Sequence, residues 1–237
     1  TYSALYNDVV FSWDFSSASG NTVSDQSPNA NDLDISGGAI IQNGTSPFPS
    51  GNSLYVNPTA NKTAKSISAV KNPPSQSFSI SFWVFPEGNG STEFLSNGYS
   101  ITPGTWRIGP HDGSNDVYFD LRVNGAVIPV LQSPPLSTSQ WYQIVAVCQY
   151  VDSGSGIAGL YVNGSLVSGP VTFTNGPCRF AANRQILIGN TSNGSYAYLV
   201  DNVRVYDQAL PLSFIKEQYL AEAPLFDGKS EVKLAKE

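Results

Sequence analysis

The stretch Y-L-V-D-N-V-R-V-Y-D-Q-A-L-P-L-S-F-I-K-E-Q-Y-L at Tyr198–Leu220 decides the fold more than any other part of the chain. In its first half Val203 and Val205 alternate with polar residues, which is the pattern of a strand with one buried face. Pro211 then stands where a helix would begin, because its missing N–H costs nothing there. The stretch therefore predicts a strand, a turn and one short amphipathic helix. Apolar residues recur at helical spacing in that helix at Leu212, Ile215 and Tyr219.

Short strand patterns recur along the rest of the chain between Gly, Pro and Asn turns. Asn124-Gly125 and Asn163-Gly164 each separate two such segments, which predicts two-residue type I′ hairpins. The 237 residues therefore predict one all-β domain, a two-sheet antiparallel sandwich of jelly-roll type with one short C-terminal helix. The expected strands cover 9–15, 53–56, 79–85, 118–123, 126–130, 141–150, 157–162, 165–167, 185–189 and 196–206.

Charge and hydrophobicity exclude several kinds of partner. The net charge is −6 and no Lys or Arg cluster is present, which argues against nucleic acid and against an anionic membrane surface. No apolar run reaches the length of a membrane span, so we expect no membrane insertion. Charged residues are only 13% of the chain, and this low charge with many small polar residues favours an extracellular or cell-surface location. The chain begins at Thr1 and lacks Met, which suggests a processed or excised segment.

Two cysteines and six sequons agree with that location. Cys148 falls in an expected strand and Cys178 follows the turn Asn175-Gly176-Pro177. The extracellular composition favours a disulfide between them, and two buried free thiols are the alternative. Asn-x-Ser/Thr sequons permit N-glycosylation without demonstrating it. They lie at Asn43, Asn61, Asn89, Asn163, Asn190 and Asn193.

The end of the chain differs from the rest. Residues 224–237 are dense in charge of both signs, and Val232 and Leu234 alternate with charged residues. We therefore expect a jelly-roll domain over 1–222 and a tail over 223–237. The tail is either a linker or a strand donated to a neighbouring sheet.

Five motifs in order resemble the laminin-G-like, concanavalin-A-like jelly-roll family. F-S-W-D-F near the N-terminus and D-Q-S-P-N-A-N-D-L at Asp25–Leu33 resemble its opening strand and Asp-x-Ser-x-Asn loop. S-I-S-F-W-V at Ser79–Val84 resembles its central tryptophan strand. Q-W-Y-Q-I-V-A-V followed by G-L-Y-V-N-G-S-L-V resembles its hairpin, and Asp201–Leu210 its closing motif. The resemblance covers about Val9 to Glu222 and implies the fold, whereas functions on this fold are diverse.

The resemblance also implies a structural Ca²⁺ at the edge of the sandwich, because hard oxygen ligands from loops suit this ion. The alternative is that Asp14 and Asp201 satisfy backbone N–H groups and that Asp25 caps its own loop. The positions that match the family's calcium ligands are Asp14, Asp25, Asn31, Asp32 and Asp201.

Groups for catalysis are scarce, so we expect no enzyme activity. The single histidine, His111, falls in a loop, and no G-x-S-x-G motif supplies a nucleophile. Glycosidases on this fold carry closely spaced carboxylates on one strand. Here Glu87 and Glu93 are six residues apart across a Gly-rich loop.

A sugar site would need an exposed aromatic platform. Tyr99 and Trp106 flank the loop I-T-P-G-T, and Tyr196 and Tyr198 lie beside Asn193. Core packing is the alternative for Trp106, because the following R-I-G reads as a strand.

These observations predict a non-catalytic adhesion or binding module that recognises glycans or a partner protein through rim loops. A structural subunit of an extracellular filament, coat or surface layer, in contact with copies of itself, is the alternative. A carbohydrate-binding module attached to an enzyme is a further one.

Overall fold

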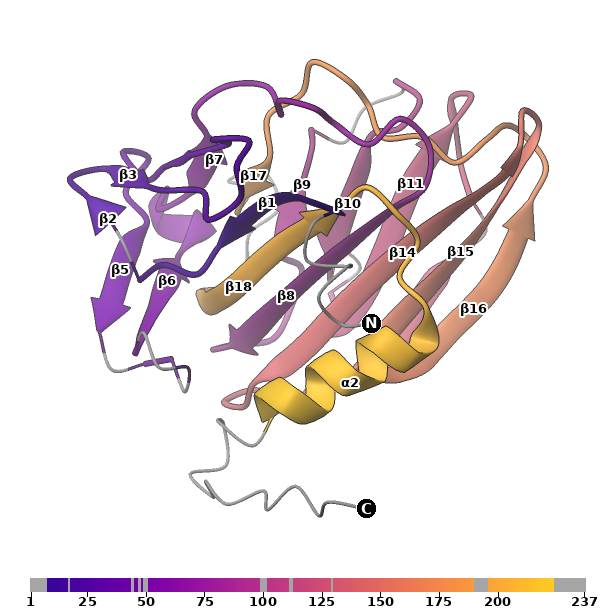
Figure 1. The fold of residues 1–237 in the computed structure, drawn as a ribbon. Coiled ribbons are helices and arrows are strands. Elements are labelled where there is room, and N and C mark those ends of the chain that lie inside the picture. Colours follow the sequence, from indigo (N-terminus) through magenta and orange to yellow (C-terminus); the bar gives the residue numbers. More distant parts are fainter. Residues whose placement is uncertain are drawn as a thin grey trace, which may run out of the picture.

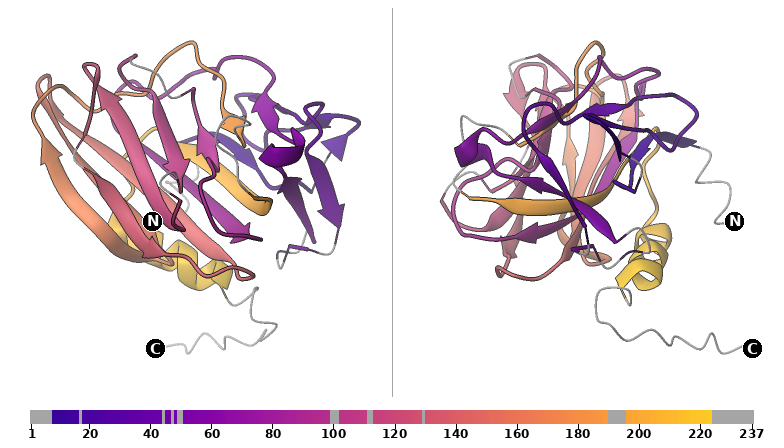
Figure 2. Two further views of the ribbon diagram at one scale, coloured as in Figure 1. Left: turned by 180° about the vertical axis from the view of Figure 1, so that it is seen from behind. Right: turned by 90° about the vertical axis from the view of Figure 1, so that its left-hand side faces the viewer.

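The structure, a computed structural model, describes residues 8–223 except 17, 44, 47, 49–50, 99–101, 111–112, 129 and 190–195. Two antiparallel sheets pack face to face and form a sandwich, with one helix on the outside (Figures 1 and 2). The predicted two-sheet antiparallel sandwich with one short C-terminal helix is therefore confirmed.

The first sheet has the order β16-β15-β14-β8-β18-β6-β5, and β1 also pairs with β18. Its central strand β8 pairs with β14 from Phe78↔Cys148 to Val84↔Tyr142. These strands cover Val9–Trp13 (β1), Ile40–Asn43 (β5), Asn52–Val56 (β6), Phe78–Pro86 (β8), Tyr142–Asp152 (β14), Ser155–Val162 (β15), Ser165–Phe173 (β16) and Tyr198–Tyr206 (β18).

The second sheet has the order β12-β11-β10-β9-β17-β7-β4-β3-β2, and β13 also pairs with β11. Many of its strands are only two residues long. They cover Ala18–Ser19 (β2), Thr22–Val23 (β3), Leu33–Asp34 (β4), Ala64–Ser66 (β7), Leu95–Ser96 (β9), Trp106–Gly109 (β10), Asp116–Val123 (β11), Ala126–Val127 (β12), Leu131–Pro135 (β13) and Leu187–Ile188 (β17). A short 3-10 helix, η2, covers Pro58–Ala60.

The core lies between the sheets and is rich in aromatic side chains. Phe82, Trp106 and Phe119 from facing strands are all fully buried. Both predicted hairpins are confirmed: β11 and β12 pair at Val123↔Ala126, and β15 and β16 pair at Val162↔Ser165. Positive φ angles at Asn124 (47°), Gly125 (84°), Asn163 (50°) and Gly164 (72°) match type I′ turns.

Helix α2, Leu212–Glu222, packs on the outer face of the first sheet (Figure 2). Its buried side chains include Phe214 and Ile215, which join a cluster with Val145 and Tyr206. The expected apolar stripe is wrong at Leu212, which is 41% exposed. The reason is that the helix starts after Pro211, and its inward face then falls on residues 214, 215 and 218.

Polar contacts fix the end of α2 to the sheet. Glu222 accepts hydrogen bonds from the indole of Trp83 and from Arg204 of β18. Tyr219 stacks on Trp83 with ring centroids 6.0 Å apart. The helix thus ends at Glu222, the last residue of the predicted domain, and residues 224–237 of the predicted tail lie outside the described residues.

Candidate binding site at the rim of the sandwich

The predicted aromatic platform is wrong for three of its four residues. Trp106 and Tyr198 are 0% exposed and Tyr196 is 8% exposed, while Tyr99 lies outside the described residues. Trp106 faces the core because it begins β10 and packs against Phe180.

The two tyrosines are held inside by hydrogen bonds. Tyr198 donates to the carbonyl oxygen of Phe94 at 2.9 Å, and Tyr196 donates to Oδ1 of Asn115 at 3.1 Å. Burial raises the pKa of both phenols well above the usual value of 10. They serve the fold and offer no surface for a sugar.

The residues that matched calcium ligands are occupied by protein donors. Both oxygens of Asp25 accept hydrogen bonds, Oδ1 from the N–H groups of Ser12 and Ser27, and Oδ2 from Asn31 N–H at 2.9 Å. Asn31 accepts from Lys71 N–H, and Asp32 accepts from Asp25 N–H. This arrangement matches the alternative in which the loop caps itself.

Asp14 and Asp201 are the other two matches. Asp14 accepts from Ser16, whereas Asp201 is fully buried and accepts from Ser46 Oγ and from Asn202 N–H. Burial, with a smaller contribution from the charge of Asp14, raises the pKa of Asp201 to about 7. Within the described part of the chain, no three His, Cys, Asp or Glu side chains converge on a point that could hold a metal. Calcium binding stays a prediction.

The described sequons differ in exposure. Asn43, Asn61 and Asn89 are exposed, whereas Asn163 is half-buried and its Oδ1 accepts the N–H of Gln143 at 2.9 Å. Asn190 and Asn193 lie outside the described residues, and so does His111.

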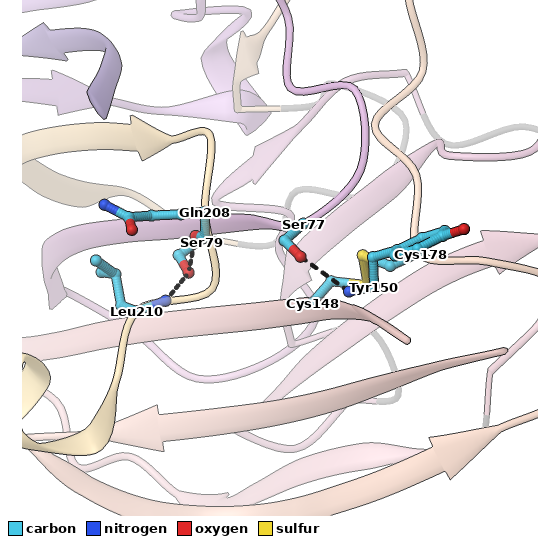
Figure 3. The surroundings of a disulfide bond; sticks show 7 residues. All are labelled: Ser77, Ser79, Cys148, Tyr150, Cys178, Gln208 and Leu210. Atoms are coloured by element: carbon cyan, nitrogen blue, oxygen red, sulfur yellow. Dashed lines mark hydrogen bonds between the residues drawn. A yellow bond between two sulfur atoms is a disulfide. The ribbon is translucent and has the colours of Figure 1, made fainter. Parts of the chain in front are cut away.

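The disulfide between Cys148 and Cys178 is confirmed (Figure 3). It ties β14 to the loop that follows β16. Next to it, Ser77 accepts the N–H of Tyr150 at 2.9 Å (Figure 3). Two residues further on, Ser79 of β8 accepts the N–H of Leu210 and donates to the carbonyl oxygen of Gln208. The loop after β16 is therefore anchored at one end of the sandwich.

At that end lies a hollow of about 500 Å³, which we call the rim pocket. Three loops form it: residues 73–75 before β8, 102–103 before β10, and 179–182 after the disulfide. Its lining is mostly apolar, and it also includes one cationic side chain, Arg179, and two hydroxyl side chains, Ser75 and Thr102. Apolar walls come from Pro73, Pro74, Pro103, Phe180, Ala181 and Ala182.

A close backbone approach holds two of these loops together. The N–H of Ala181 donates to the carbonyl oxygen of Gly104 at 2.9 Å, and the N–H of Gly104 donates to the backbone carbonyl oxygen of Arg122 at 2.7 Å. A Cβ on Gly104 would lie 2.7 Å from the nitrogen of Ala181, and its φ is +83°. Only glycine fits here.

A second hollow of about 350 Å³ lies beside the start of α2, among Val147, Tyr161, Leu210 and Leu212. We choose the rim pocket because it is larger and presents charged and apolar groups together, as ligand sites do. The sequence pointed to one of its loops, I-T-P-G-T, but to the wrong side chains. The feature of the sequence that could have indicated the pocket is Arg179, a cationic residue between the apolar residues Cys178 and Phe180.

Comparisons with known proteins extend this picture. The family model described as the Concanavalin A-like lectin/glucanases superfamily matches residues 53–216. No curated protein matches the sequence. No helix among residues 8–223, as far as they are described, is long and apolar enough to cross a membrane.

Several solved structures share the fold. The binding domain of Paraclostridial Mosquitocidal Protein 1 is 18% identical with a TM-score of 0.67, over 92% of this chain and 53% of that one. The botulinum neurotoxin serotype D ligand-binding domain, in complex with N-acetylneuraminic acid, is 15% identical with a TM-score of 0.67, over 93% and 52%. Botulinum neurotoxin type C, described as entering cells through two ganglioside molecules, is 12% identical with a TM-score of 0.68, over 93% and 53%. This chain spans about half the length of each.

Proposed function

The chain belongs to the concanavalin A-like lectin/glucanases superfamily, and we propose that it is a non-catalytic, extracellular module that binds glycans through the rim pocket. The observation that carries the proposal is the pocket itself, an apolar hollow with a few polar groups at its edge. Loops at one end of a rigid sandwich are where binding residues commonly gather.

The anchoring of the pocket supports this proposal. Phe180 is 3% exposed and packs against Phe78 and Trp106 of the core, with ring centroids 5.3 and 5.9 Å away. The disulfide holds the same loop two residues earlier. A loop fixed at both points loses little conformational freedom when a ligand binds, which favours affinity.

The disulfide also supports an extracellular setting, because such bonds persist in oxidising compartments. The use of carboxylates supports a role without catalysis. Asp120 pairs with Arg107 at 2.8 Å and Glu222 with Arg204 at 2.7 Å. Both carboxylates thus have a structural role as partners of arginines, and neither lines the rim pocket.

The similar solved structures add a weaker argument. Several are receptor- or ligand-binding domains, and one is named for binding N-acetylneuraminic acid. Their identity to this chain is low, and it spans about half of each. They therefore suggest glycans as the ligand class to test first.

A glycan array with the full chain and two variants tests the proposal. Ala182 is exposed and lines the pocket, so Ala182→Trp should fill the hollow and lower glycan affinity at least tenfold. Ala221 is also exposed but lies on α2, so Ala221→Trp is a matched control that should bind as the parent does. Both variants should melt within about 2 °C of the parent. Binding that survives Ala182→Trp, or no binding of any glycan, would contradict the proposal.

A further inference from the structure

Cationic side chains gather around the rim pocket of an otherwise acidic chain. The net charge of the sequence is −6, yet Arg179 lines the pocket and Arg184 donates a hydrogen bond to Thr102 in its wall. An acidic protein repels anions in general, so a local group of cations selects where an anion can bind.

Arg179 is held at the pocket by its neighbours in sequence. Cys178 is 1% exposed in the disulfide and Phe180 is 3% exposed in the core. Because both neighbours point inward, the side chain between them points out, and Arg179 is exposed. Its place at the pocket is therefore fixed although its guanidinium remains in solvent.

Arg179 also differs from the arginines that serve the fold. Arg107 and Arg204 each pair with a carboxylate, Asp120 and Glu222 respectively. In the described part of the chain, Arg179 forms no hydrogen bond or ion pair. Its five donors remain available to a ligand.

Arg184 supplies a second guanidinium at the same pocket. Its Nη2 donates to Thr102 Oγ1 at 2.9 Å, and Thr102 lines the pocket. Its backbone carbonyl accepts the N–H of Val70 at 2.9 Å, which holds it beside the loop that leads to Pro73. Lys71, in that loop, is exposed but does not line the pocket, because its Nζ donates to the carbonyl oxygen of Ala30 at 2.7 Å.

One acidic residue beside the loop after β16, Asp152, has its own partners. Asp152 is the last residue of β14, at the turn to β15. This turn lies beside the loop after β16, because the N–H of Gly176 donates to the carbonyl oxygen of Gly154. Its carboxylate accepts hydrogen bonds from Gly154 and Ser155, which lower its pKa. Arg179 is not among the causes of that shift.

An apolar hollow beside two guanidiniums suits a ring with one apolar face and one carboxylate. Proline and alanine walls can cover the C–H face of a pyranose, and arginine binds carboxylates with two parallel hydrogen bonds. We infer that the rim pocket binds an acidic sugar at the end of a glycan, with its carboxylate held by Arg179 and Arg184. The inference rests on the proposed function and names its ligand class.

Titration calorimetry with the full chain tests the inference. The probes are lactose capped with N-acetylneuraminic acid, the same glycan as its methyl ester, uncapped lactose, and a disaccharide ending in glucuronic acid. The acidic forms should bind at least tenfold more tightly than the ester and uncapped lactose. Arg179→Gln should remove that preference, and Arg179→Lys should recover part of it. Lys216→Gln removes the same charge from an exposed position on α2 and should change nothing.

The outcomes separate the two proposals. Equal affinity for acid and ester, unchanged by Arg179→Gln, overturns the acidic-sugar inference and leaves glycan binding at the rim intact. Absence of binding to every glycan, here and on the array, overturns both. A Glu-rich peptide that binds through Arg179 more tightly than any sugar also overturns the inference, because the ligand would then be a protein segment. Melting curves of both Arg179 variants should match the parent, which excludes misfolding as the cause.

Discussion

At the scale of single residues, Asp201 is a buried carboxyl that acts against stability at neutral pH. Its pKa of about 7 lies above the ordinary value of 3.8, chiefly because of burial. At pH values between 3.8 and about 7, the carboxyl of Asp201 is therefore protonated in the folded state and ionised in the unfolded state. Stability from this residue is therefore complete below about pH 4 and is lost as the pH rises to about 7.

We expect Asp201→Asn to remove the loss of stability that Asp201 causes as the pH rises, because the amide of Asn has the same shape as the carboxyl and does not ionise. The free energy of unfolding of the variant relative to the parent should rise between pH 4.5 and 7, at a slope of up to about 1.4 kcal/mol per pH unit. Urea unfolding at a series of pH values measures it. Parallel curves for the two proteins would show that Asp201 titrates alike in both states.

Gly104 provides a second residue-scale prediction. Alanine there would meet the backbone of Ala181 and would also need a positive φ. Gly125 has nearly the same φ, +84°, with no atom within 4 Å of a built Cβ. We expect Gly125→Ala to cost about 1–2 kcal/mol from backbone strain alone, and Gly104→Ala to cost clearly more and to weaken ligand binding. Equal costs in urea unfolding would contradict the close approach of the two loops.

At the scale of elements, the disulfide joins β14 to the loop that carries Arg179. It closes a loop with a sequence separation of 30 residues, for which chain entropy suggests about 3–4 kcal/mol of stabilisation. The double variant Cys148→Ser, Cys178→Ser should lose roughly that amount in urea unfolding. It should also bind glycans more weakly under conditions in which it is still folded, because the loop that carries Arg179 is no longer tied to β14. Alkylation of the untreated protein should find no free thiol.

Helix α2 is the other element whose attachment can be measured. Phe214 is 2% exposed against the first sheet, whereas Leu220 on the same helix is 67% exposed. Phe214→Ala should therefore cost about 3–5 kcal/mol, and Leu220→Ala less than about 0.5 kcal/mol. Thermal and urea unfolding measure both. A small cost at Phe214 would mean that the helix adds little to the sandwich.

The elements also show what the sequence could predict. Asn124-Gly125 and the Val203 and Val205 alternation are local signals, so the hairpins and β18 were predictable. Strands such as β4 and β9, with two residues each, are too short to show a period. They form only because longer strands beside them complete the second sheet.

The candidate site was harder to predict for a related reason. Trp106 could equally have been an exposed platform or a core residue. A shift of one residue in the strand register moves its side chain to the other face of the sheet, and the local sequence does not determine that register. The burial of Asp201 depends on Ser46, which is 155 residues away in sequence. The pocket itself joins three distant loops, and only the fold brings them together.

At the scale of the whole molecule, the two ends of the sandwich differ. The loop with Pro73 and Pro74 leads into β8 at Phe78, and Asn89 follows β8 after Pro86, roughly 25 Å away along the strand. Asn163 lies in the same direction, just past the middle of β8, because Val162 pairs with Ile144 and Ile144 with Phe82. Carbohydrate attached at these sequons would leave the rim pocket uncovered.

Arg179 and Arg184 also place a local positive charge at the rim of a chain whose net charge is −6. Near an acidic glycan layer this local positive charge would favour approach with the rim forward before any contact forms, and encounters would then be productive more often. This orientation acts over about one Debye length, near 8 Å at physiological ionic strength. Association with an acidic surface should therefore slow markedly between 50 and about 500 mM salt while dissociation changes little, which surface plasmon resonance can measure. An Arg179→Gln variant should have the flatter salt dependence.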